Sequence, residues 1–383
     1  MNTLKEKMDL LLDFVRRQLK QEISIWNQLN VTGGKVLFPF VTRNGKWSWE
    51  DKWSNGFFAG QLWLMFAMDQ DEFWKESADK ATTALEPYKY HGDFQDIGYL
   101  FIFSYITGYK LTGNSKYRTV ALEAADSLFD SLMPGGYLKC NWLADGEHYQ
   151  GIDAMMNIGL WLWAFRETDN SKYRIAAEGC IDNILRTMIF SDGRTCEYVK
   201  FNGEDREIEI YNKNAAEANS VWSRGHSWAI YGMVQAFLNL GHFEYLDVID
   251  KLTSFYQKNT DDSLIPHWDM LIKHQTTLRD ASAASIVASA LLQLASHLDD
   301  KSQKKAYADL GLSILDTLIT NTYMASSVRD HEGILLHAST PKSVTFTKGE
   351  SQIWGDYFLL ETILNLQNVN LRWRANEYHG RVD

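Results

Sequence analysis

The sequence predicts an all-α fold, the six-hairpin (α/α)6 barrel or toroid, which spans residues 1–383 as a single domain. Nearly all-apolar helices alternate with amphipathic ones along the whole chain. A short turn sequence also occurs twice, each time before an amphipathic helix. No long stretch shows the apolar–polar alternation that is typical of strands, and no low-complexity linker divides the chain.

The expected helices form pairs. The first helix runs from Leu4 to about Trp26, and a glycine- and aromatic-rich loop follows it from 31 to 53. Apolar helices are expected at 56–68, 96–109, 153–165, 224–240, 280–297 and 354–366, and amphipathic ones at 71–86, 115–132, 171–189, 242–256 and 302–319. The first helix would pair with the last apolar helix and complete the ring.

The repeated turn indicates stacked helical pairs, with apolar helices inside and amphipathic helices outside. It reads GNSKYR at 113–118 and DNSKYR at 169–174. Because the inner helices of a toroid run parallel, their N-terminal ends meet at one mouth. Polar groups mark these ends, at Ser54-Asn55, Gln95-Asp96, Asp153, Ser223-Arg224-Gly225-His226, Arg279-Asp280 and Asp356. Convergent polar groups in an aromatic concavity predict an active site at the mouth.

Asp153 and Asp96 are the expected catalytic pair, because they occupy equivalent positions on neighbouring inner helices. One carboxyl held neutral and one ionised would serve as proton donor and partner. The alternative is that each is an ordinary helix N-cap, a position that Asp favours.

Other mouth residues are candidates for substrate binding. Arg224 suits a two-pronged grip on a carboxylate, and the alternative is a structural pair with a nearby Asp. Trp53, Trp142 and Trp228 are candidates to stack on a sugar ring, and the alternative for each is a place in the core. His226 is a candidate donor to substrate, although a lone His is more often a polar residue with ordinary structural partners.

Composition excludes several classes of function. The net charge of −11 and the lack of a basic stripe argue against nucleic acid, and an anionic substrate would need a local cationic clamp. No apolar run approaches the ~20 residues of a membrane span, and three cysteines, an odd number without metal-type spacing, favour a cytoplasmic protein with free thiols. A monomer or small homo-oligomer is expected, although no sequence feature fixes the oligomeric state. No metal or cofactor is expected, because HExxH, CxxC, phosphate-loop and dinucleotide patterns are absent.

Five ordered blocks span nearly the whole chain. They are WSNGFFAGQLWL at 53–64, QDIGY at 95–99, IDAMMN at 152–157, SRGHSWAIYG at 223–232 and IWGDYF at 353–358. Together they resemble glycoside hydrolase family 88, the unsaturated glucuronyl hydrolases. The resemblance implies a six-hairpin α/α barrel, in agreement with the fold predicted from periodicity.

The resemblance also implies a reaction. Enzymes of this family release the 4,5-unsaturated uronic acid from the non-reducing end of lyase-generated glycosaminoglycan oligosaccharides of the chondroitin, hyaluronan or heparin type. They hydrate the C4=C5 enol ether instead of attacking the anomeric carbon, unlike the usual two-carboxylate schemes. By motif, Asp153 would be the general acid/base and Asp96 its partner carboxylate. Arg224 and the tryptophans Trp53, Trp142 and Trp228 would bind the unsaturated uronyl substrate.

Some positions depart from the family pattern. Gln95 stands where the family usually has His, Asn214 and His226 stand where it has Gln, and Glu197 falls where a loop His is expected. Gln95, Asn214 and His226 are therefore expected to contact substrate in place of the usual residues. The Ser and Lys motif that reads sulfate in some members is not cleanly reproduced, so the preferred glycosaminoglycan stays open.

Three alternatives remain at this level. Unsaturated rhamnogalacturonyl hydrolases run the same chemistry on pectin fragments, and the 223–225 and 354–356 blocks favour family 88 over them. Sugar epimerases share the toroid but need a His-based acid/base pair, and only His226 is expected at the mouth. A non-catalytic sugar-binding toroid would keep the tryptophans and tolerate loss of Asp153.

Overall fold

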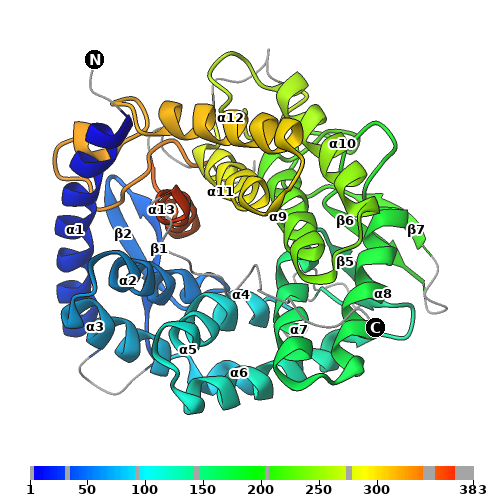
Figure 1. The fold of residues 1–383 in the computed structure, drawn as a ribbon, viewed down its shortest axis with the longest axis horizontal. Coiled ribbons are helices and arrows are strands. Elements are labelled where there is room, and N and C mark those ends of the chain that lie inside the picture. Colours follow the sequence, from blue (N-terminus) through cyan, green and yellow to red (C-terminus); the bar gives the residue numbers. More distant parts are fainter. Residues whose placement is uncertain are drawn as a thin grey trace.

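The protein is a ring of helices in two layers (Figure 1). The computed structural model describes residues 4–30, 35–91, 95–140, 147–202, 207–272, 278–339 and 350–366. The inner layer consists of α2 (Asn55–Asp69), α4 (Ile97–Phe101) with its continuation, α7 (Ala154–Thr168), α9 (Ser223–Leu240), α11 (Ala281–His297) and α13 (Ile353–Leu366). The outer layer consists of α1 (Leu4–Leu29), α3 (Glu72–Thr83), α6 (Ser115–Ser127), α8 (Ser171–Thr187), α10 (Glu244–Asn259) and α12 (Lys301–Leu318). This is the predicted toroid.

The inner layer closes on itself. Contacts run from α2 to α4, then to α7, α9, α11 and α13, and α13 packs against α2 again. The second inner helix is interrupted, because a π-helical turn at Ile102–Ile106 separates α4 from α5 (Thr107–Thr112). Three short 3-10 segments, Glu86–Tyr90, Leu128–Ser131 and Ala325–Ser327, lie in the connections.

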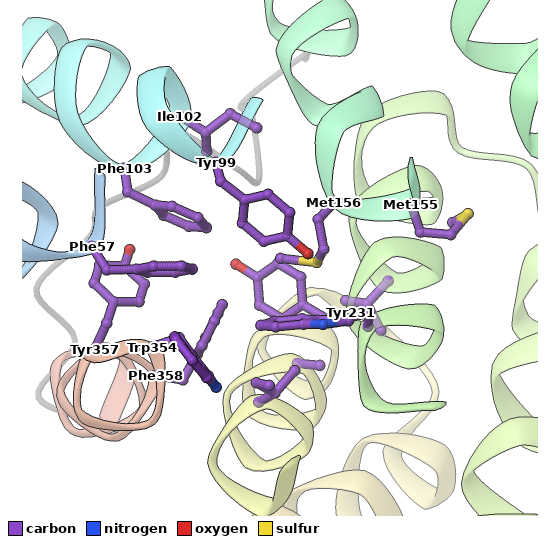
Figure 2. Close-up of a cluster of buried hydrophobic side chains, with 14 of the residues drawn as sticks. Phe57, Tyr99, Ile102, Phe103, Met155, Met156, Tyr231, Trp354, Tyr357 and Phe358 are labelled. Atoms are coloured by element: carbon purple, nitrogen blue, oxygen red, sulfur yellow. The ribbon is translucent and has the colours of Figure 1, made fainter. Parts of the chain in front are cut away.

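Burial follows the apolar and amphipathic patterns. Every residue of α11 from Ala281 to Ala295 is buried, whereas α10 buries only one face, around Ile249, Leu252 and Tyr256. Aromatic rings from α2, α4, the π-helical turn and α13 fill the barrel beneath the mouth (Figure 2). Phe57 and Phe103 are stacked with ring centroids 4.6 Å apart, and such pairs add to the stabilisation from burial alone.

Two glycines bring the mouth ends of three inner helices into backbone contact. A Cβ on Gly56 would lie 2.3 Å from the carbonyl oxygen of Tyr99, and one on Gly98 would lie 2.5 Å from Oδ1 of Asn157. Any side chain at either position would push α2 from α4, or α4 from α7. The glycines thus set the close spacing of the helices that carry Asp96 and Asp153.

The connections contain strands that the sequence did not predict. β1 (Phe38–Arg43) and β2 (Lys46–Glu50) form an antiparallel hairpin where only a loop was expected, and that prediction was wrong. Its turn is Asn44-Gly45, both with positive φ, which is the strongest short-range signal for a hairpin.

The other strands are shorter. β3 (Leu132–Met133) pairs with β4 (Tyr137–Leu138), and β5 (His148–Gly151), β6 (Tyr198–Phe201) and β7 (Glu207–Tyr211) form an antiparallel sheet in that order. Because β5 leads directly into α7, this sheet borders the start of that helix. Within the described residues, no helix has the length and apolar composition to cross a membrane.

Candidate active site

Asp153 and Asp96 occupy the N-cap positions of α7 and α4, but neither side chain caps its helix. In two outer helices, by contrast, the aspartate at the N-cap position does cap its helix. Asp71 accepts a hydrogen bond from the backbone N–H of Phe73, and Asp300 from that of Gln303. The helix-cap alternative therefore does not account for the two mouth carboxylates.

Asn157 joins the two aspartates. Its side-chain Nδ2 donates to Oδ1 of Asp96 over 3.2 Å and to the backbone carbonyl of Asp153 over 3.2 Å. Its Oδ1 accepts from the backbone N–H of Tyr99, again at 3.2 Å. One buried amide thus ties the start of α4 to the first turn of α7. Asn157 belongs to the motif at 152–157, but no role was predicted for it.

The surroundings of Asp153 favour the protonated acid. Its Oδ1 is buried and, within the described part of the chain, accepts no hydrogen bond. Burial, together with the negative charges of Asp96 and Glu197, raises the pKa of Asp153 well above its ordinary value, and Arg224 opposes this only in part. A carboxyl whose pKa is raised by burial and by neighbouring carboxylates is suited to the role of a general acid.

Glu197 is a third buried carboxyl of the site, with 3% of its surface exposed. It accepts a hydrogen bond from the backbone N–H of Asn214 at 2.6 Å and another from the Asn214 side-chain amide. Its backbone carbonyl accepts from Ile152, the residue before Asp153, at 2.9 Å. Burial raises the pKa of Glu197 to about 7, against the effect of these hydrogen bonds. Asn214 therefore holds Glu197, whereas the sequence predicted that Asn214 binds substrate directly.

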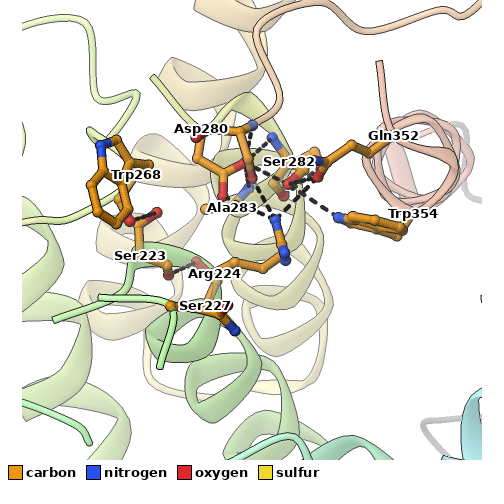
Figure 3. Close-up of polar contacts among 12 residues, drawn as sticks. Ser223, Arg224, Ser227, Trp268, Asp280, Ser282, Ala283, Gln352 and Trp354 are labelled. Atoms are coloured by element: carbon orange, nitrogen blue, oxygen red, sulfur yellow. Dashed lines mark hydrogen bonds and ion pairs between the residues drawn. The ribbon is translucent and has the colours of Figure 1, made fainter. Parts of the chain in front are cut away.

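Arg224 lies in the first turn of α9, and its guanidinium is buried between two indole rings. The guanidinium carbon is 4.7 Å from the ring centroid of Trp222 and 5.0 Å from that of Trp354. Nη1 donates to the carbonyl of Ser339 at 2.7 Å and to Oε1 of Gln352 at 3.1 Å (Figure 3).

The same nitrogen of Arg224 lies 3.5 Å from Oδ2 of Asp280. Asp280 also caps α11 through the backbone N–H groups of Ser282 and Ala283, so it is a structural anchor. In contrast, Nε of Arg224 is buried without a partner among the described residues. One side of the guanidinium is thus fixed by the protein, whereas the Nε–H donor is unused within the described residues.

The tryptophans predicted to stack on a sugar ring differ in position and burial. Trp53 is only partly buried, at the mouth, with its ring 4.8 Å from Trp354 and 5.0 Å from Tyr99. Trp228 is 1% exposed and packs on Tyr99 and Phe358 in the barrel, so it supports the floor of the site and offers no free face to a sugar. Trp142 lies outside the described residues. Trp222 and Trp354, for which no binding role was predicted, hold Arg224.

Gln95 is buried beside Asp96, and neither its Oε1 nor its Nε2 has a hydrogen-bond partner within the described ranges. The hydroxyl of Tyr99 is likewise buried without a partner. Unpartnered buried polar atoms are uncommon and costly, so their concentration next to Asp96 indicates a candidate ligand site.

His226 does not face the mouth, so its predicted role in binding substrate is corrected. The ring is fully buried, with Nε2 3.0 Å from the carbonyl of Leu252 and Nδ1 3.3 Å from the hydroxyl of Thr195. Burial lowers its pKa to about 4, so it is neutral. His226 joins α9 to α10, on the side of α9 opposite to Arg224.

Asp356, another polar residue near an inner-helix start, is also structural. It accepts backbone hydrogen bonds from Ile334 at 2.9 Å and Leu335 at 2.8 Å. Among the described residues, no group of three or more His, Cys, Asp and Glu is placed to hold a metal ion.

The model of Glycosyl Hydrolase Family 88 matches residues 27–310. The chain belongs to this family. Two neighbouring carboxyls, Asp153 and Asp96, and an arginine, Arg224, at the mouth of the α/α barrel agree with membership of a glycoside hydrolase family. The family model covers the segments that carry Asp96, Asp153, Glu197 and Arg224.

Individual relatives agree with this membership. The unsaturated chondroitin disaccharide hydrolase of Streptococcus pneumoniae is 26% identical over 96% of this chain and 94% of its own length. The unsaturated glucuronyl hydrolase of Bacillus sp. GL1, described as responsible for the degradation of glycosaminoglycan, has a similar structure, with a TM-score of 0.83, 25% identity and coverage of 92% and 97%. The Streptococcus agalactiae enzyme shares the fold with a TM-score of 0.87 at 22% identity, over 96% and 93%.

Proposed function

We propose that this enzyme releases the 4,5-unsaturated uronic acid from the non-reducing end of glycosaminoglycan oligosaccharides by hydrating the C4=C5 double bond. The observation that supports the proposal most is the Asp153 carboxyl, whose Oδ1 is buried without a partner among the described residues and whose pKa is raised by burial and by the charges of Asp96 and Glu197. The relatives named for unsaturated chondroitin disaccharide and unsaturated glucuronyl hydrolysis support the choice of substrate.

Binding begins with the substrate carboxylate. An unsaturated uronate carries this group on C5, next to the reacting bond, and the Nε side of Arg224 is the free donor that would bind it. Trp222 and Trp354 keep the guanidinium plane fixed, so the carboxylate is held in one orientation. Trp53, partly exposed at the same mouth, offers a face to the sugar ring, and Trp142 keeps this role as a prediction.

The chemical step is proton transfer from Asp153 to C4. The π electrons form the new C4–H bond, and the positive charge that develops at C5 is shared with the ring oxygen. Water then adds to C5 while the Asp153 carboxylate accepts its proton, which restores the acid. The hemiketal at C5 opens, and the masked aldehyde of C1 is freed as the next sugar departs. The overall reaction consumes one water for each glycosidic bond that is cleaved.

Asp96 acts as the partner carboxylate. Its hydrogen bond from Asn157 stabilises the ionised form, and the negative charge keeps the proton on Asp153 until substrate is bound. The same charge lies close to the developing cation at C5, so it stabilises the transition state electrostatically.

Turnover of a substrate panel tests the proposal. Purified wild-type enzyme would be mixed with unsaturated disaccharides from chondroitin, hyaluronan, heparin and pectin, and the absorbance of the C4=C5 bond followed. The expected result is loss of absorbance with at least one glycosaminoglycan disaccharide and none with the pectin disaccharide. Activity on pectin alone, or on none of the four, would refute it. The cytoplasmic location and the oligomeric state stay predictions.

A further inference from the structure

Gln352 lies directly before α13, and its side-chain amide contacts Arg224 (Figure 3). Its Oε1 is 3.1 Å from Nη1 of Arg224 and 3.4 Å from Oγ of Ser282. The residue is 1% exposed, so the amide is buried together with the guanidinium. No role was predicted for Gln352 from the sequence.

The contact with Arg224 fixes which way the amide of Gln352 faces. A guanidinium only donates hydrogen bonds, so the amide atom that faces Nη1 must be the oxygen. The NH2 group of the amide is therefore directed away from Nη1. Its Nε2 is buried and has no hydrogen-bond partner among the described residues. A buried NH2 group without an acceptor is costly, so this nitrogen indicates a candidate contact for a ligand.

Arg224 and Gln352 together present two unused donors close to each other. Nε of Arg224 is also buried without a partner in the described part of the chain. The two polar atoms of an amide are about 2.3 Å apart, so Nε2 of Gln352 is at most about 5.5 Å from Nη1 of Arg224. A carboxylate has two oxygens with about four acceptor positions, so one carboxylate is able to accept a hydrogen bond from each residue.

The two donors suit a group that only accepts hydrogen bonds. A hydroxyl would also need an acceptor, whereas the unused atoms of Arg224 and Gln352 are both N–H donors. The guanidinium charge favours an anion further. Trp354, which packs on Arg224, also lies 4.8 Å from the ring of Trp53, the partly buried residue proposed to contact the sugar. The donors are thus linked by direct packing to the residue proposed to contact the sugar ring.

We infer that Gln352 is a further substrate-binding residue, whose side-chain amide donates a hydrogen bond to the C5 carboxylate of the unsaturated uronyl group, beside Nε of Arg224. The inference rests on the proposed function, because it concerns the substrate of the same site. The alternative is a positioning role, in which Gln352 only holds Arg224. Positioning needs only Oε1 of the amide, whereas substrate binding needs its NH2 group.

Gln352→Glu separates the two roles. Glutamate keeps an oxygen for Nη1 of Arg224 but replaces the NH2 donor with a second oxygen, which repels the substrate carboxylate. KM for an unsaturated chondroitin disaccharide should rise by about tenfold or more, and kcat should change less, because the contact is the same in the ground state and the transition state. Gln303→Glu, which adds the same charge on the exposed first turn of α12, should leave KM unchanged. An unchanged KM in folded Gln352→Glu enzyme would overturn the inference.

Gln352→Met controls for the added charge, because it removes the NH2 donor and introduces no carboxylate. KM should again rise, by a smaller factor, and an unchanged KM would assign the effect of glutamate to charge alone and overturn the inference.

A crystal structure of the Asp153→Asn enzyme with the unreacted disaccharide distinguishes contact from positioning without any change at Gln352. One carboxylate oxygen should lie about 3 Å from Nε2 of Gln352, and an oxygen of the same carboxylate should lie about 3 Å from Nε of Arg224. A bound carboxylate more than about 4 Å from Nε2 would overturn the inference while leaving the proposed function intact. Absence of turnover by wild-type enzyme on every unsaturated disaccharide would instead refute the proposed function.

Discussion

Asn157 donates a hydrogen bond from its side-chain amide to Asp96 across the contact between α7 and α4, at 3.2 Å. The same nitrogen also holds the backbone carbonyl of Asp153, so a single buried amide fixes the relative placement of the two carboxylates. The proposed proton donor and its partner are therefore positioned by a hydrogen bond between two inner helices, without any contribution from substrate.

Replacing Asn157 with Ala should therefore lower kcat by about tenfold or more, because Asp96 loses its orienting donor and shifts relative to Asp153. KM should change less, since Arg224 is untouched. Steady-state kinetics checks this, with Asn183→Ala as the control, because Asn183 is a buried amide of α8 that bonds the carbonyl of Gly135 away from the mouth. Equal loss of kcat in the two variants would contradict the positioning role.

The clamp role of Arg224 is best examined with Arg224→Lys. Lysine keeps a positive charge for Asp280 but lacks the Nε–H donor, so KM should rise by about tenfold while kcat falls less. Arg224→Ala is a poorer probe, because an unpaired buried Asp280 would destabilise the fold by about 3 kcal/mol. An unchanged KM in Arg224→Lys would contradict the role of Arg224 in binding the substrate carboxylate.

The raised pKa of Asp153 sets the direction of the pH dependence. Catalysis needs the protonated acid, so kcat/KM should fall as pH rises through the pKa of Asp153 in the free enzyme. Glu197 raises that pKa by its negative charge. Glu197→Gln should therefore move the alkaline fall to lower pH, and the exposed-site variant Glu209→Gln should not move it. A shift to higher pH would be inconsistent with the electrostatic link between Glu197 and Asp153.

His226 should matter for stability and not for binding. Its pKa is lowered from 6.5 in the unfolded chain to about 4 in the folded protein, so its contribution is complete above pH 6.5 and is lost as the pH falls toward 4. Chemical denaturation at several pH values should show a smaller acid-induced loss of stability in His226→Gln than in wild type. KM should stay the same in His226→Gln. A large rise in KM would instead support the prediction from the sequence that His226 contacts substrate.

The two helical layers were predictable because the spacing of apolar residues in the sequence agrees with the burial of side chains in the described helices. Parallel inner helices also place Asp96, Asp153 and Arg224 at one end, as the structure has them. The error at His226 has a geometric cause, since a residue two positions after Arg224 points about 200° away around the helix. On a helical wheel of α9, Arg224 and His226 already lie on nearly opposite faces.

The environment of Glu197 was beyond sequence reasoning. Its approach to Asp153 depends on the pairing of β5 with β6 and on the hydrogen bond from Ile152, both of which join segments distant in sequence. The β1–β2 hairpin was missed although Asn44-Gly45 signals it, because its strands are short and rich in aromatic residues on both faces. The contact of Trp354 with Arg224 likewise joins segments distant in sequence, because α9 and α13 both pack against α11 in the ring.

Asp153 is the proposed proton donor, and the variant Asp153→Asn should remain folded. A carboxyl whose pKa is raised in the folded state reduces stability as pH rises above the unfolded value of 3.8. Asparagine removes that penalty and no helix cap is lost, so the variant should be at least as stable as wild type at pH 7. Asp71→Asn, at a carboxylate that does cap its helix, is the matched control for the cap and should keep full activity.

The most direct measurement is the rate at which wild-type and Asp153→Asn enzymes remove the C4=C5 absorbance of an unsaturated glycosaminoglycan disaccharide at neutral pH. Wild-type enzyme should remove the absorbance steadily, and kcat should be lower by about a thousandfold or more in the variant, with an unchanged circular dichroism spectrum. A folded Asp153→Asn enzyme that turns over the disaccharide at the wild-type rate would contradict the assignment of Asp153 as the proton donor.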